Sequence, residues 1–138
     1  MLRVHRRLKI MKKDFDKWNK EKKELHEKDV ELYYHVREIW WCYLGLNVGT
    51  EQDGNDKKFL RPVVIVRAFG PATCLIVPLT TSTKKHPLRI FVGKIKNKDA
   101  SAVLSQMKVV DTKRLLEKID SVEKDVFKEL RKTIKKLF

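Results

Sequence analysis

The chain has 138 residues, 42% of them hydrophobic, which is enough for one modest core and one domain. Its 32 Lys and Arg residues outnumber 18 Asp and Glu residues, and the formal charge of +14 favours polyanionic partners, although a merely solvated basic surface would look the same. No apolar run approaches the roughly 18 residues of a membrane span, and the basic N-terminus lacks the apolar core of a secretory signal. We therefore expect no membrane association and a cytoplasmic location.

The N-terminal region has the composition of a charged helix. Residues 12–31 are dense in Lys, Glu and Asp, and apolar side chains recur there at spacings of three, four or seven, at Met11, Phe15, Trp18, Leu25 and Leu32. This spacing predicts one apolar helical stripe, suited to a helix that lies on a domain or a partner. We expect residues 1–35 to form a basic, charged helical extension, with the natural start at Met1 or Met11 left open.

From residue 38 the pattern changes to apolar runs of four to eight residues separated by Gly, Pro and Asn, which is typical of short strands. Five strands are predicted, at residues 38–44, 62–67, 73–79, 88–92 and 102–110. Residues 45–60 carry turn residues without periodicity and predict a long loop, a candidate flap over a substrate. Asp111 can cap a short helix that runs to Leu116, and residues 120–138 predict a longer helix with a capping-box spacing from Asp120 to Glu123.

These elements predict a mainly β, α+β fold, in which a small, strongly bent antiparallel sheet or barrel carries peripheral helices. Cys42 and Cys74 lie in apolar runs without CxxC spacing, so we expect reduced, buried thiols. Trp40 and Trp41 are adjacent in a predicted strand and must point to opposite faces. One of the two is expected in the core and the other at the surface or an interface, and the sequence does not decide which.

Two polar residues occupy the ends of predicted apolar strands. Arg61 immediately precedes Pro62, where its guanidinium could bind two phosphate oxygens, and Thr80 follows another strand with a hydroxyl that can donate to phosphate. Taken alone, such an Arg is more often a surface ion pair and such a Thr a turn residue. The four histidines are scattered without ligand spacing and no carboxylate cluster stands at a strand end, so we expect neither a metal site nor a cofactor.

Several segments together resemble the MazF/PemK family of toxin endoribonucleases, from about residue 38 to the C-terminus. The segments are Trp40-Trp41, Glu51-Gln52, Arg61-Pro62-Val63-Val64-Ile65-Val66, Val77-Pro78-Leu79-Thr80-Thr81-Ser82 and Ser105-Gln106-Met107-Lys108-Val109-Val110-Asp111. The resemblance implies an SH3-like barrel that dimerises, with the toxin domain at residues 36–138. One departure is Arg37, where a Gly often precedes the Glu-Ile-Trp strand.

The resemblance also implies a function. The expected protein is the toxin of a type II toxin-antitoxin pair, a homodimer that cuts single-stranded RNA at specific sequences without a metal. It would leave a 2′,3′-cyclic phosphate and a 5′-hydroxyl, with RNA in a groove across the dimer interface. A cognate antitoxin with an acidic, partly disordered segment would occupy the same groove, and the basic charge of the chain suits such a ligand.

By the same resemblance, Arg61 and Thr80 are the catalytic pair. A guanidinium is a poor base, so Arg61 is assigned mainly to charge stabilisation. The general base stays open between Glu51, in a loop similar to the Gly-Ser-Glu-Gln loop of the family, and His86, whose ordinary pKa suits proton transfer. RNA contacts are expected from polar, basic and aromatic side chains at Trp41, Gln52, Thr81, Ser82, Lys84 and Lys85.

Two alternatives are retained. A gyrase poison of the CcdB type shares the fold, but that family uses a C-terminal Trp, whereas this chain ends Lys135-Lys136-Leu137-Phe138. The second alternative is a non-catalytic nucleic-acid-binding barrel, in which Arg61 only contacts phosphate.

Overall fold

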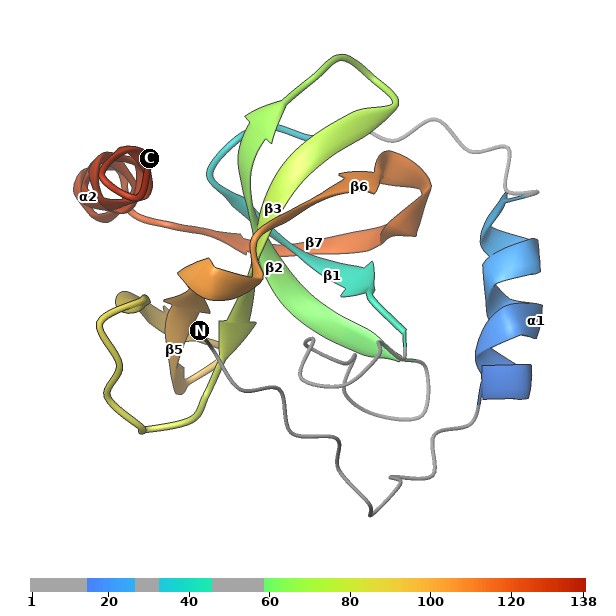
Figure 1. Cartoon of the computed structure of the whole chain (residues 1–138), viewed down its shortest axis with the longest axis horizontal. Helices are drawn as coiled ribbons and strands as arrows, with labels where there is room; N and C mark the ends of the chain where they lie inside the picture. The colour runs from blue at the N-terminus through green and yellow to red at the C-terminus, as the bar shows by residue number, and fades with distance from the viewer. Residues whose placement is uncertain (1–14, 27–32, 46–58) are drawn as a thin grey trace, which may run out of the picture.

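The computed structural model describes residues 15–26, 33–45 and 59–138, and the fold is built from these (Figure 1). The helices are α1 (Phe15–His26) and α2 (Lys124–Lys135), and two short 3-10 turns are η1 (Leu104–Gln106) and η2 (Thr112–Arg114). The strands are β1 (Glu38–Tyr43), β2 (Leu60–Ala68), β3 (Thr73–Thr80), β4 (Arg89–Ile95), β5 (Lys98–Val103), β6 (Lys108–Asp111) and β7 (Leu115–Ser121).

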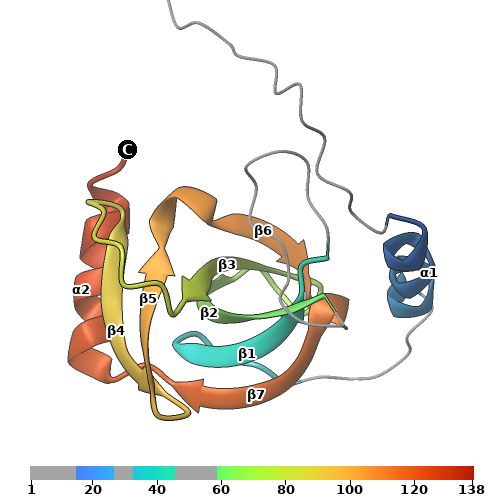
Figure 2. The same ribbon diagram turned by 90° about the horizontal axis from the view of Figure 1, so that it is seen from below.

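The strands of the described residues form one curled antiparallel sheet with the order β4-β5-β3-β2-β1-β7, and β6 pairs with β3 off this path (Figure 2). Strand β3 connects the two halves of the curl. Its first residues, Thr73 to Ile76, pair with β6, whereas Leu79 and Thr80 pair with β5. The predicted mainly β, α+β class with a bent antiparallel sheet is confirmed.

Strand β2 is buried on both faces, which explains its nearly continuous apolar sequence. Val64 and Val66 pack on one face in a cluster that includes Phe127, Leu130 and Ile134 of α2. On the other face, Val63 and Ile65 pack with Trp40, Cys42, Cys74 and Ile76 in a second cluster inside the curl. Helix α2 therefore covers one side of the sheet, and the curl of the sheet encloses the other.

The alternation of β1 settles the orientation of the two tryptophans. Trp40 is buried and belongs to the cluster inside the curl, whereas Trp41 is half-buried. Trp41 lies on the same face as Ile39, which packs with the α2 side of the core. The indole of Trp41 is thus at the surface beyond the part of the sheet that α2 covers.

Two local predictions were wrong. The predicted strand at residues 102–110 is interrupted by η1, so β5 ends at Val103 and β6 begins at Lys108. The predicted helix from Asp111 to Leu116 is only the η2 turn: Asp111 does cap it, by accepting a hydrogen bond from the backbone N–H of Lys113, but β7 begins at Leu115. Residues 115–121 are rich in Leu, Glu and Lys, which favour helices in isolation, and pairing with β1 overrides that preference.

The start of the C-terminal helix was also misplaced. Asp120 is the penultimate residue of β7, and its carboxylate accepts from the neighbouring N–H of Ser121 at 2.7 Å instead of capping a helix. Helix α2 begins at Lys124 with Glu123 at the N-cap position, without a side-chain cap bond. The spacing of residues 120–138 predicts an apolar helix face of Val122, Val126, Phe127, Leu130, Ile134 and Leu137. Phe127, Leu130 and Ile134 are buried on that face, whereas Leu137 is 40% exposed and Val122 precedes the helix.

Helix α1 packs on the barrel through Trp18. This indole is 5% exposed and lies 5.5 Å from the ring of Phe59, and the guanidinium carbon of Arg114 sits 5.6 Å above it. Arg114 also donates to the carbonyl oxygen of Tyr43 at 3.0 Å. The predicted helix at residues 12–31 is observed as 15–26, and the rest of that range lies outside the described residues.

Both cysteines are free and buried, as predicted. Burial raises the pKa of Cys42 to about 12 and that of Cys74 to about 11, so both thiols stay protonated at neutral pH. Within the described part of the chain, neither helix is long and apolar enough to cross a membrane.

Candidate functional site

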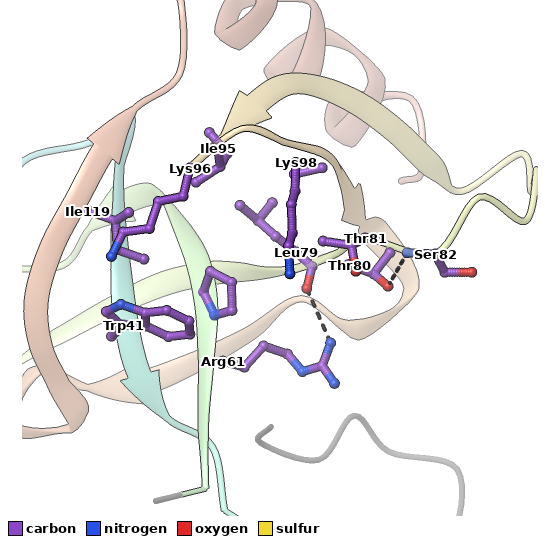
Figure 3. A pocket seen from close by; sticks show the side chains of 12 residues that line it. Trp41, Arg61, Leu79, Thr80, Thr81, Ser82, Ile95, Lys96, Lys98 and Ile119 are labelled. Carbon is purple, nitrogen blue, oxygen red and sulfur yellow. Dashed lines mark hydrogen bonds between the residues drawn. The ribbon is translucent and has the colours of Figure 1, made fainter. Parts of the chain in front are cut away.

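A pocket of about 560 Å³ opens where the sheet extends beyond α2 (Figure 3). Its floor is continuous with the α2 side of the core, because Leu79 and Ala100 belong to that cluster and Ile95 and Ile119 pack against it. The lining residues come from six strands and two turns, and they are Trp41, Arg61, Pro62, Leu79, Thr80, Thr81, Ser82, Ile95, Lys96, Lys98, Ala100 and Ile119.

Arg61 is held in the pocket by the backbone of the next strand. It lies within β2, which begins at Leu60, two residues before the predicted start of the strand. Pro62 is tolerated there because β2 pairs only with β1 at this point, and pairing with β3 begins at Val63. The Arg61 side chain is 8% exposed, and its Nη1 donates to the carbonyl oxygen of Leu79 at 3.2 Å (Figure 3). A guanidinium stays charged even when buried, so this contact fixes a permanent positive charge beside the end of β3.

Thr80 is the last residue of β3 and directly follows Leu79, whose carbonyl binds Arg61. Thr80 therefore lies next to Arg61. The Thr80 hydroxyl accepts a hydrogen bond from the backbone N–H of Ser82 at 3.1 Å and can still donate its own proton. The hydroxyl of Ser82 in turn accepts from Nη1 of Arg89 at 3.1 Å. These bonds order the exposed turn after β3 and keep the hydroxyls at the rim of the pocket.

The other end of the pocket is apolar and is covered by a lysine. Trp41 lies opposite Pro62 in the pairing of β1 with β2. The Nζ of Lys96 lies 5.8 Å from the centre of the Trp41 ring, which is cation–π geometry. Lys96 and Lys98 flank Asn97 in the β4–β5 hairpin, and Lys98 reaches over the middle of the pocket, between Trp41 and Thr80 (Figure 3).

The charge of the pocket is one-sided. Its described lining residues include Arg61, Lys96 and Lys98 and no carboxylate. Cations around apolar walls of low dielectric attract anions more strongly than the same cations on an open surface. The arrangement can bind a phosphodiester through Arg61 and the hydroxyls, and can hold a planar apolar group on Trp41.

Most of the predicted site residues that are described meet in this pocket. Arg61, Thr80, Thr81, Ser82 and Trp41 all line it. Lys84 and Lys85 follow in an exposed turn outside the lining set, as does His86, whose Nδ1 accepts from the N–H of Leu88 at 3.0 Å. Glu51 and Gln52 lie outside the described residues.

Lys96, Lys98 and Ile119 were not singled out from the sequence. The sequence did hold a local signal for the two lysines, which is Asn97 between them. Asn tolerates the positive φ of two-residue hairpin turns, and in the structure Lys96 and Asn97 have φ values of 50° and 66°. Recognising that hairpin would have placed both lysines at its tip. Ile119 had no such signal, since its strand was not predicted. Among the described residues, no group of three or more His, Cys, Asp or Glu side chains is placed to hold a metal ion.

Comparison with known proteins identifies the class. Residues 35–138 match the family described as PemK-like, MazF-like toxin of type II toxin-antitoxin system. This match covers more than half of the chain, and the chain therefore belongs to the PemK-like, MazF-like toxin family. No curated protein sequence matches it significantly.

Solved structures share the fold at low identity. The chain is similar to MazF from Deinococcus radiodurans, with 17% identity and a TM-score of 0.62 over 77% of this chain and 96% of that one. For the Mycobacterium tuberculosis toxin MazF-mt6, identity is 15% and the TM-score 0.57 over 72% and 94% of the two chains. An endoribonuclease in complex with its cognate antitoxin from a mycobacterial species gives 14% identity and a TM-score of 0.58 over 75% and 93%. The strand arrangement is thus that of MazF-type toxins, even where few side chains agree.

Proposed function

We propose that this toxin cleaves single-stranded RNA as a metal-independent, sequence-specific endoribonuclease. The observation that carries the proposal is the meeting of Arg61 and Thr80 in one cationic pocket, on a chain of the PemK-like, MazF-like family. One of the similar structures is named as an endoribonuclease, which agrees with this assignment.

The proposed reaction is an internal transesterification. The 2′-oxygen of the ribose attacks the adjacent phosphorus, a 2′-O–P bond forms, and the bond from phosphorus to the 5′-oxygen of the next nucleotide breaks. The 2′-hydroxyl proton goes to a base and the leaving 5′-oxygen gains a proton, so the products are a 2′,3′-cyclic phosphate and a 5′-hydroxyl. DNA lacks the attacking hydroxyl and should not be cut.

Arg61 is assigned to the charge that develops on the phosphate oxygens. Its burial and its bond to the Leu79 carbonyl hold the guanidinium before substrate arrives, so little reorganisation is needed in the transition state. The Thr80 hydroxyl is assigned as a second donor to a phosphate oxygen. We assign the base to Glu51, in the segment Gly49-Thr50-Glu51-Gln52, rather than to His86, which does not line the pocket.

We further propose a homodimeric toxin domain at residues 36–138, with residues 1–35 as an extension, acting in the cytoplasm. The family match from residue 35 supports this division. The partner would be a cognate antitoxin with an acidic segment that competes with RNA for the cationic pocket. Relatives solved with an antitoxin support such a partner, and so does the formal charge of +14.

The experiment compares the wild type with Arg61→Ala, Arg61→Lys and Thr80→Val on a long single-stranded RNA in excess chelator, with cleavage ends mapped by primer extension. Arg67→Ala is the matched control, because Arg67 is an exposed arginine on the same strand. Loss of one donor to the developing charge should lower kcat about 10²- to 10³-fold in Arg61→Ala, with a much smaller loss of RNA binding. Arg67→Ala should cut like the wild type.

Intact RNA under conditions where the wild type binds it would overturn the enzyme assignment and favour a non-catalytic binding barrel. In that case Arg61→Ala would lose only a modest share of affinity and of salt dependence. Cleavage that the chelator abolishes would overturn the metal-independent mechanism.

A further inference from the structure

The two ends of the pocket differ in chemistry, and only one end is used by the proposed cleavage step. Arg61, Thr80 and Ser82 present a guanidinium and hydroxyls at one end. Trp41, Ile95 and Ile119 form an apolar end with no role in moving protons or stabilising phosphate. A half-buried indole in a pocket of about 560 Å³ offers a surface that suits a flat, apolar occupant.

Lys96 now covers this indole, but the contact is of a kind that is easily displaced. The Lys96 side chain is exposed, and its Nζ lies 5.8 Å from the ring centre. An exposed cation–π contact changes an equilibrium by about twofold to fivefold, whereas stacking of a nucleobase on an aromatic ring contributes roughly fivefold to 150-fold. A nucleobase should therefore displace Lys96 from the Trp41 ring, and the freed ammonium can then contact the RNA backbone.

The rest of the geometry fits a nucleotide that bridges both ends. Figure 3 shows Lys98 between Trp41 and Thr80, where it can neutralise a phosphate that links them. Pro62 and Trp41 are cross-strand neighbours, and Pro62 directly follows Arg61 in β2, so the stacking surface and the guanidinium belong to adjacent positions of the same sheet.

We propose that Trp41 is the stacking platform for one unpaired nucleobase next to the phosphate held by Arg61 and Thr80, with Lys96 as its displaceable cover. This inference rests on the proposed action on RNA. A base stacked on Trp41 cannot remain paired within a helix, and every base has a π-face, so the platform selects single-stranded RNA and tolerates all four bases. Sequence preference must then come from other contacts.

The test is a double-perturbation cycle of protein and substrate. Short RNA oligonucleotides that contain a mapped cleavage site carry an abasic ribose at each position in turn, and each is cut by the wild type, Trp41→Leu, Trp41→Phe and Phe91→Leu. Phe91 is the matched control, since it is an aromatic residue 59% exposed on β4 that does not line the pocket. Light scattering after gel filtration records the assembly state of each variant.

At one position beside the cleaved phosphate, the abasic sugar should lower kcat/KM of the wild type roughly fivefold to 150-fold. Exchange among the four bases there should change it far less. Trp41→Leu should lower kcat/KM for intact RNA by a similar factor and show no further loss with that abasic RNA. Trp41→Phe keeps an aromatic ring and should retain the loss at that abasic position, whereas Phe91→Leu should behave like the wild type.

Equal abasic sensitivity in the wild type and Trp41→Leu at every position would overturn the proposal. So would a Trp41→Leu variant that loses its assembly state without position-specific coupling, because Trp41 would then serve a subunit interface. If the wild type cuts no RNA, the proposed function fails separately, and equilibrium binding of the same abasic series still tests the platform.

Discussion

Arg37 shows how one residue is held in a conformation that glycine adopts more readily. Its φ is 78°, in the left-handed region. The sheet holds it there through three hydrogen bonds. Its N–H donates to the Ile65 carbonyl at 2.7 Å, its carbonyl accepts from the N–H of Val122 at 2.9 Å, and its Nη1 donates to the Val122 carbonyl at 2.9 Å. A Gly at this position would adopt the same φ without the steric cost of a Cβ.

Two substitutions at Arg37 should separate backbone strain from side-chain bonding. Arg37→Ala and Arg37→Gly both lose the side-chain hydrogen bond to the Val122 carbonyl, but only alanine keeps a Cβ at a positive φ. We expect Arg37→Gly to be more stable than Arg37→Ala by about 1 kcal/mol, measured by urea unfolding. An alanine variant as stable as the glycine variant would show that the site carries no strain.

Glu38 is a nearly buried carboxylate whose charge is stabilised in the folded state. Burial alone would raise its pKa, but hydrogen bonds from the backbone N–H of His35 at 2.6 Å and the indole of Trp40 at 3.2 Å oppose this. The ammonium of Lys118 lies 3.2 Å from the second oxygen. The net effect lowers the pKa of Glu38 below its ordinary value of 4.5.

A carboxylate whose pKa is lower in the folded state stabilises the fold at any pH above its ordinary, unfolded-state pKa. That stability is lost as the pH falls through the folded-state pKa. Glu38→Gln should therefore cost about 1.5–3 kcal/mol of unfolding free energy at pH 7, and the cost should shrink as the solution is acidified below pH 4.5. Urea unfolding across this range measures it, with the exposed β7 residue Glu117→Gln as control. A cost that does not change with pH would contradict the assignment of the stabilisation to the charged carboxylate.

At the scale of elements, helix α1 packs on the barrel through Trp18, which lies directly against Gly45. Gly45 has a φ of 68°, and a Cβ there would lie 2.0 Å from Cε2 of Trp18. The N–H of Gly45 also donates to the carbonyl of Phe59 at 3.1 Å, so Trp18 packs where the chain leaves β1 and returns to β2. The apolar stripe of the predicted extension thus has a defined docking site on the domain.

Gly45→Ala should release α1 without unfolding the sheet. Gly70→Ala is the control, because its φ of 95° imposes similar strain while nothing lies within 4 Å of the added Cβ. Trypsin should cut within the lysine-rich α1 faster in Gly45→Ala, by about tenfold for each 1.4 kcal/mol of docking free energy lost. Equal cleavage rates in the two variants would contradict docking through Trp18.

Element types were easier to predict than their ends. Strands β1, β2 and β3 followed from apolar runs, since strands buried on both faces need apolar residues at nearly every position. Strand β7 was missed because its sequence favours a helix and its pairing partner, β1, lies about 75 residues earlier in the chain. Local patterns do not contain such a partner.

At the scale of the whole molecule, the charge of +14 is a general attraction for polyanions, and the pocket adds a local one. Each phosphate contact to single-stranded nucleic acid adds about 0.7 to the slope of log affinity against log salt. The double variant Lys96→Ala, Lys98→Ala should therefore lower this slope by about 1.4 if both ammonium groups contact phosphate.

Fluorescence anisotropy with a 2′-O-methyl RNA, which lacks the attacking hydroxyl, measures the slope without cleavage. Lys128→Ala with Lys132→Ala is the matched control, since both lysines are exposed on α2 and outside the pocket. An equal change of slope in the two double variants would mean that binding follows net charge and not the pocket.

The amino-acid sequence by itself determined the family, the mainly β class, the burial of both cysteines and the buried positions Phe127, Leu130 and Ile134 of α2. Each of these depends on residue type and short-range spacing, which do not require knowledge of strand pairing. It also identified Arg61 and Thr80 as neighbours of strand ends.

Only the tertiary structure decided which tryptophan faces the pocket, that Lys96 covers it, and that Ile119 completes its floor. These facts arise from the register of β1 with β2 and β7 and from the change of partner along β3. A shift of one residue in such a register turns every side chain of a strand to the opposite face, so the composition of the pocket is set by long-range pairing.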